Sequence, residues 1–200
     1  NTPLFSRKTS DRVIGLRLIG VKVHGIGDYA YLVDTTVKGG ANLMTEVLRL
    51  TILDLQKRGK LPTVNPKLYL QMDNCKENKN KVVFAFCSDL VEKKIFQQVY
   101  VGFLMVGHTH EDIDQFFSVI SAWLKKWDTI CPDIESLKRE IVKAFNSKQK
   151  EPPRIFQLSA IEVFDYTSFY APQISSKLAY YTVPHQFRFA VFENSVLCHY

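Results

Sequence analysis

The chain has 200 residues, of which 46% are hydrophobic and 23% are charged, and its formal net charge at pH 7 is +6. This composition is typical of a soluble globular domain and excludes a disordered or low-complexity scaffold. No apolar run approaches the roughly 18 residues of a membrane-spanning helix, so we expect no membrane span. The excess of basic residues is compatible with a polyanionic partner.

The cysteines and the first residues bear on the compartment. The four cysteines are widely separated and include no CxxC pair, which favours reduced thiols. The first residues form neither the basic segment nor the apolar segment of a secretory signal. We therefore expect a nuclear or cytoplasmic protein that is not secreted. The sequence does not indicate its oligomeric state.

Strand patterns alternate with helix patterns in the first half of the chain. Residues 13–24 and 29–33 are apolar segments around a glycine-rich turn, which predicts a hairpin. Asn42 is placed to cap the amphipathic helix that follows it. A short strand is expected at residues 67–72, and the apolar spacing over residues 83–95 predicts a second helix.

The second half continues the alternation and then changes character. Residues 99–106 form a near-continuous apolar run, which predicts a strand buried on both faces of a sheet. Helices are expected from Thr109 and over residues 134–145. Pro152 and Pro153 then mark a boundary before a β-rich, aromatic stretch.

This order of elements predicts the fold class. Strands that alternate with helices indicate an α/β protein with a mixed sheet flanked by helices. We expect the α/β core over residues 1–150 and a small β-rich C-terminal extension over residues 151–200.

Two acid-rich clusters follow predicted strands, where open α/β sheets bind ligands. The first contains Asp73, Asn74 and Asn78, and the second contains Asp112 and Asp114. Carboxylates that converge at one rim suit Mg²⁺ or Mn²⁺, which prefer oxygen ligands. The structural alternative is a turn after a strand for the first cluster and helix-capping acids for the second.

Two histidines precede the second acidic cluster. His108 and His110 are separated by one residue, and the string from His108 to Asp112 resembles the H-x-H-x-D-H motif of zinc hydrolases. Ile113 stands where that motif has its last histidine, so a zinc hydrolase is the weaker alternative. We expect both histidines to support the acidic site by orienting its carboxylates.

Lysines cluster beside the first acidic group. Lys76, Lys79 and Lys81 lie within six residues of one another and could neutralise phosphates of a nucleic acid. The alternative reading is a solvated face of the chain.

Two strings resemble one known family. They are residues 68–80, with Asp73-Asn74-Cys75 and Glu77-Asn78-Lys79-Asn80, and residues 107–117, with His108-Thr109-His110-Glu111-Asp112-Ile113-Asp114. They resemble a transposable-element-derived domain of unknown function whose layout is similar to ribonuclease H-like transposase and integrase cores. The resemblance extends over nearly the whole chain.

The resemblance implies a function in DNA processing. A ribonuclease H-like core holds two metal ions with three acids, on its first strand, after its fourth strand and on a later helix. By position, Asp73 matches the second acid, and Asp114, or else Asp112, matches the third. The resemblance places the first acid on a strand upstream of Asn1.

Two function hypotheses follow from the resemblance. The first is a DDE-type nuclease or strand transferase that acts on DNA with Mg²⁺ or Mn²⁺, inactive in this fragment if the upstream acid is required. The second is a domesticated, non-catalytic domain that binds nucleic acid or protein through the same surface.

Overall fold

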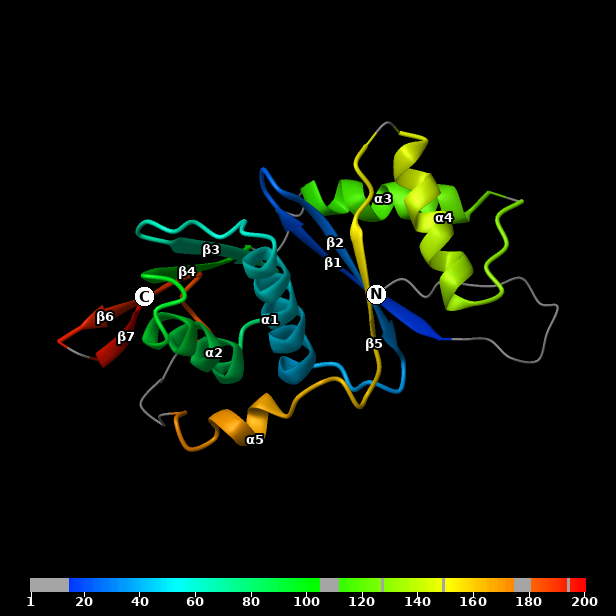
Figure 1. Ribbon diagram of the computed structural model, residues 1–200. Coiled ribbons are helices and arrows are strands. Elements are labelled where there is room, and N and C mark those ends of the chain that lie inside the picture. The colour runs from blue at the N-terminus through cyan, green and yellow to red at the C-terminus, as the bar shows by residue number, and fades with distance from the viewer. Residues whose placement is uncertain (1–14, 105–111, 127, 149, 175–180, 194) are drawn as a thin grey trace. The chain divides into compact units, whose positions relative to one another are not determined.

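The computed structural model describes residues 15–104, 112–126, 128–148, 150–174, 181–193 and 195–200. These residues form seven strands and five helices, and the strands make two mixed sheets flanked by helices (Figure 1). The predicted α/β class is therefore confirmed. No helix in these ranges is both long enough and apolar enough to cross a membrane.

The chain divides into two compact units, each of which is described by itself. The first consists of residues 1–37 and 110–162, and the second of residues 38–109 and 163–200. The described strands of the last fifty residues join both sheets. The proline pair at 152–153 directly precedes one of these strands.

The first unit contains a three-stranded sheet in the order β1-β2-β5. β1 (Leu16–Val23) and β2 (Gly27–Asp34) form the predicted antiparallel hairpin. β5 (Arg154–Leu158) then pairs parallel with β2, which makes β2 the central strand. Five consecutive residues of β2, from Tyr29 to Val33, are fully buried.

Two helices pack on this sheet. α3 (Asp112–Leu124) and α4 (Ile134–Asn146) place Phe116, Ile120 and Ile141 against Ala30 and Leu32 of β2. α3 lies so close to β1 that a Cβ added at Gly20 would stand 2.9 Å from the Phe116 ring. A glycine is required here by space rather than by backbone conformation.

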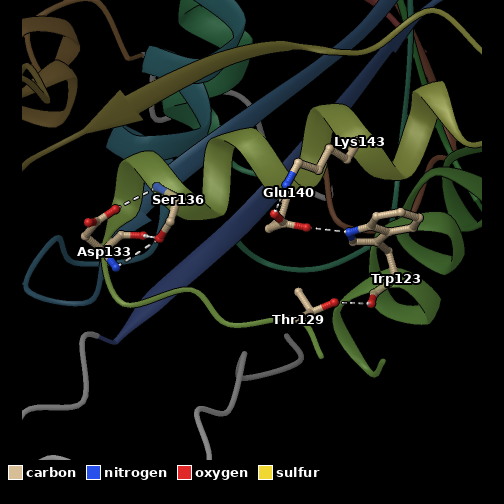
Figure 2. Close-up of polar contacts among 6 residues, drawn as sticks. All are labelled: Trp123, Thr129, Asp133, Ser136, Glu140 and Lys143. Atoms are coloured by element: carbon tan, nitrogen blue, oxygen red, sulfur yellow. Dashed lines mark hydrogen bonds and ion pairs between the residues drawn. The ribbon is translucent and has the colours of Figure 1, made fainter. Parts of the chain in front are cut away.

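Polar contacts join α3 to α4 (Figure 2). The indole Nε1 of Trp123 donates to Oε2 of Glu140 at 2.9 Å, and Lys143 donates to the other oxygen of Glu140 at 2.6 Å. Asp133 and Ser136 form a reciprocal capping box at the start of α4. These groups satisfy one another, so we assign them a structural role.

The second unit contains a four-stranded sheet in the order β3-β4-β6-β7. β3 (Lys67–Met72) and β4 (Gln98–Phe103) are parallel neighbours, whereas β6 (Gln186–Phe192) and β7 (Ser195–His199) continue the sheet in antiparallel pairing. The adjacency of β3 and β4 brings the strands that precede the two acidic clusters together.

Helices cover one face of this sheet, which we call the inner face. α1 (Ala41–Lys57), α2 (Lys81–Glu92) and α5 (Tyr166–Tyr170) contribute to a single apolar core with the sheet. The strands contribute buried side chains to this core, among them Val99, Val101, Phe103, Phe187 and Phe189. α2 and α5 lie on the same side of these strands in Figure 1.

The opposite face carries polar and aromatic side chains. We call it the outer face. Its side chains include Lys67, Tyr69, Gln98, Tyr100, Arg188 and His199. Burial alternates along β4, so the prediction that this strand is buried on both faces is wrong. Tyr100 occupies an apolar run in the sequence but points to the partly open face.

Asn42 does not cap α1, which is a second correction. The N-cap of α1 is Gly40, and it makes no side-chain cap hydrogen bond. Asn42 lies inside the helix and binds α5 instead: its Oδ1 accepts from the Thr167 backbone N at 2.8 Å and its Nδ2 donates to Asp165 at 3.0 Å. This contact spans more than 120 residues of sequence, which a local capping pattern does not reveal.

Candidate functional site

The candidate site begins at the carboxyl end of β3. Because β3 and β4 are parallel, their carboxyl ends lie at the same edge of the sheet, with Met72 opposite Phe103. The backbone N of Leu104 donates to the Met72 carbonyl at 3.1 Å and extends this pairing. Asp73 follows directly, so the first predicted acid stands where α/β sheets bind ligands.

Asp73 is exposed, and the turn that follows it orients its carboxylate. The Asp73 Oδ1 accepts from the Cys75 backbone N at 3.1 Å and from the Asn78 Nδ2 at 2.6 Å. The first contact closes a turn around Asp73. Burial, together with the neighbouring Asp73, raises the pKa of the Cys75 thiol, so Cys75 stays protonated beside the carboxylate.

Asn78 has an unsatisfied oxygen next to this carboxylate. Asn78 is only 8% exposed, and its Nδ2 donates to the Asp73 carboxylate. Its Oδ1 is buried and has no hydrogen-bond partner within the part of the chain that the structure describes. Buried amide oxygens are nearly always satisfied by protein, water or an ion, so this oxygen is an acceptor open to a water or an ion.

The remaining asparagines of the motif have different surroundings. Asn74 is exposed. Asn80 caps α2, and its Oδ1 accepts from the backbone N of Val82 and of Val83, each at 3.0 Å. The asparagine-rich string therefore combines a helix cap with the polar group around Asp73.

The three lysines proposed to contact nucleic acid are not equivalent. Lys76 is exposed, and Lys81 stands 5.7 Å from the ring centroid of Tyr181. Lys79 is only 6% exposed, and its Nζ donates to the Thr182 carbonyl at 2.7 Å. Burial lowers the pKa of Lys79. Of the three, Lys76 offers its charge to a ligand most freely.

The second acidic cluster begins α3 in the other unit. Asp112 and Asp114 lie in the first helical turn, where carboxylates complement the helix dipole. The Asp112 side chain is 70% exposed, and its Oδ2 lies 3.9 Å from Nδ1 of His24. His108 and His110 lie outside the described residues, so their predicted supporting role stays a prediction.

The oxygen donors at β3 fit a hard cation only in part. Asp73 supplies a carboxylate and Asn78 a buried amide oxygen, both suited to Mg²⁺ or Mn²⁺. Within the ranges that the structure describes, no group of three His, Cys, Asp or Glu side chains is arranged to hold a metal ion. The sequence indicated Asp73, whereas the orphan oxygen of Asn78 is visible only in the packed loop.

Comparison with known proteins places the chain in a family. The model of the family described as domain of unknown function (DUF7869) matches residues 6–200. Because this match covers nearly the whole chain, the chain belongs to that family. No curated protein and no solved structure matches the chain.

Proposed function

We propose that this family member is the core of a DNA-processing protein, descended from a DDE-type transposase, that cuts or joins strands with Mg²⁺ or Mn²⁺. The resemblance of the two central motifs supports the family of reactions. The observation that carries the proposal is the group at the carboxyl end of β3: an exposed carboxylate, Asp73, oriented by Asn78, whose own oxygen is buried without a described partner.

The residues of this group have distinct roles in the proposal. A divalent cation bound here would supply charge stabilisation for in-line phosphoryl transfer. Asp73 would be its carboxylate ligand, and the Asn78 Nδ2, which donates to that carboxylate, would fix its orientation in the way that outer-shell groups do. The buried Asn78 oxygen would be left to accept a hydrogen bond from the ligands of the site.

The third acid of the proposed set is Asp114, with Asp112 as the alternative. Both acids stand at the start of α3. His108 and His110 are proposed to orient these carboxylates.

Free sheet edges are compatible with an additional strand. Among the described strands, β1 and β3 each pair on one side only. A strand carrying the first acid, as the resemblance implies, would find unpaired backbone groups at either edge. The proposed ribonuclease H-like core requires such a strand for strong metal binding.

The test is a Mn²⁺ titration of the full chain, followed by electron paramagnetic resonance. We expect weak binding that Asp73→Asn abolishes. We expect Asn78→Ala to weaken it, because the carboxylate loses its orienting donor. The matched control is Asp128→Asn, which removes an exposed carboxylate elsewhere and should leave Mn²⁺ binding unchanged.

Other outcomes of this titration identify the alternatives. Mn²⁺ binding that is equal in Asp73→Asn and in the unmodified chain would contradict the proposal. Absence of binding, even in a chain extended by an upstream acidic strand, would leave the non-catalytic interaction domain. Tight, stoichiometric Zn²⁺ would instead favour the zinc hydrolase.

A further inference from the structure

The outer face of the four-stranded sheet contains a continuous row of side chains. Tyr69 is paired with Tyr100, Tyr100 with Arg188, and Arg188 with His199 in the strand register. Residues paired across neighbouring strands point to the same face. The row therefore crosses all four strands, on the side opposite to the core shared with α1, α2 and α5.

The two tyrosines of this row form a stacked pair, which we call the aromatic platform. Their ring centroids are 4.8 Å apart and their planes differ by 8°. Tyr69 is 69% exposed and lies on the edge strand β3, so the ring face turned away from Tyr100 meets no described strand. The Tyr100 hydroxyl donates to Gln98 at 2.7 Å, and this hydrogen bond holds the Tyr100 ring in place.

Positive charge borders this platform. The Arg188 guanidinium lies 5.9 Å from the Tyr100 ring centroid, and Lys67 is exposed two residues before Tyr69. The four strands contain no Asp or Glu. The carboxylates that follow strands, Asp73 and Glu193, lie beyond the strand ends. The Lys and Arg side chains that these four strands place on the outer face therefore have no acidic residue among them.

Sheet stability explains only part of this arrangement. A cross-strand tyrosine pair stabilises two strands, and this accounts for the contact between the rings. It does not account for a platform left open on one side, or for cations with no acidic partner in the same four strands. Aromatic rings beside basic side chains are the surface on which unpaired bases stack.

We propose that the outer face binds single-stranded nucleic acid, with a base stacked on the open ring face of Tyr69 and phosphates paired with Lys67 and Arg188. Duplex DNA is a poor ligand, because its bases are already stacked on one another. The inference deepens the proposed function and rests on it, because the proposed function is the reason for holding a nucleic-acid strand near Asp73. Stacking itself needs no metal ion.

The experiment measures fluorescence anisotropy of labelled twelve-residue oligo(dT) and oligo(U) in excess EDTA. We expect both to bind the unmodified chain, and a twelve-base-pair duplex to bind more weakly. Tyr69→Ala should weaken binding about tenfold, because one base loses its stacking partner. Tyr69→Phe should retain most of the affinity, because the ring remains.

The matched control is Tyr200→Ala. Tyr200 is also 69% exposed, but its ring lies 6.2 Å from that of Phe187, which belongs to the inner face. This variant should bind like the unmodified chain. Equal affinity of Tyr69→Ala and the unmodified chain, or absence of binding to both oligonucleotides, would overturn the inference.

The two proposals fail separately. EDTA removes any contribution of a metal ion, so loss of the Mn²⁺ site leaves oligonucleotide binding intact. Tyr69→Ala should conversely retain Mn²⁺ binding. If Asp73→Asn retains Mn²⁺ binding while Tyr69→Ala weakens oligonucleotide binding, only the proposed function fails.

Discussion

The inner and outer faces of the four-stranded sheet are built from alternating residues of the same strands, yet they differ in kind. The inner face places Phe187 and Phe189 in a core where each is at most 2% exposed. The outer face places Arg188 between these two residues in sequence and leaves Tyr69 mostly open. The inner face supplies the apolar core, whereas the outer face holds aromatic and basic groups that lie outside that core.

The largest expected effect is the loss of unfolding free energy on substitution of an inner-face residue, compared with the same substitution on the outer face. Phe189→Ala should lower the free energy of unfolding by about 3–5 kcal/mol, because it leaves a cavity between the sheet and α2. Tyr69→Ala should cost no more than about 1 kcal/mol, the value of an exposed cross-strand pair. Urea denaturation measures both. Comparable losses would show that the outer face is also a folding element.

A smaller effect is expected at the buried hydrogen bond between α5 and α1. The Tyr166 hydroxyl of α5 donates to Glu46, which is 1% exposed and also binds Arg49. Tyr166→Phe removes this donor and should cost about 1–3 kcal/mol of unfolding free energy. Tyr200→Phe, at an exposed tyrosine, is the control and should be neutral. A neutral Tyr166→Phe would mean that Arg49 alone satisfies Glu46.

How much of this was visible in the sequence depends on the range of the interaction. The hairpin of β1 and β2 follows from a local pattern and was predicted. The long-range pairing of β5 with β2 was not, because no local signal says which strand a final segment will join.

The candidate site shows the same division. Asp73 follows a strand pattern, so its place at the carboxyl end of a strand could be predicted. The orphan oxygen of Asn78 and the burial of Lys79 depend on how the loop packs, and residue type alone did not reveal them. The Tyr69–Tyr100 platform depends on strand register, which the apolar run around Tyr100 conceals.

The pH dependence of stability provides a third comparison between the faces. Burial raises the pKa of the Cys198 thiol, on the inner side of β7, to about 11. An unfolded thiol ionises near 8.5. Since the folded pKa is the higher one, the contribution to stability is complete below about pH 8.5 and is lost as the pH rises toward 11.

Cys198→Ala tests this sign. The unmodified chain should lose more stability between pH 8.5 and 10.5 than the variant does, by at most about 1 kcal/mol because Cys198 is only partly buried. Denaturation at a series of pH values measures the difference. His199→Ala, at the adjacent outer-face position, should leave the alkaline slope unchanged. Parallel curves for Cys198→Ala and the unmodified chain would refute the predicted ionisation.

The smallest effect on stability is expected at Arg188. Arg188→Gln should change the unfolding free energy by less than about 0.5 kcal/mol, as is usual for surface positions. It should nevertheless lower the salt dependence of oligonucleotide binding by about 0.7 in log–log slope, the value of one phosphate contact on a single strand. Lys60→Gln, at an exposed lysine outside the sheet, should leave that slope unchanged.

The most direct test of the outer face as a ligand surface is photocrosslinking with an oligo(dT) that carries 5-iodouracil. Irradiation joins such a base to an aromatic ring stacked on it, and mass spectrometry of the digested complex identifies the joined peptide. The arrangement of the face predicts crosslinks at Tyr69, whose outward ring face is open. Crosslinks confined to Tyr181, beside Lys81, would contradict it and would place the strand at the lysine cluster instead.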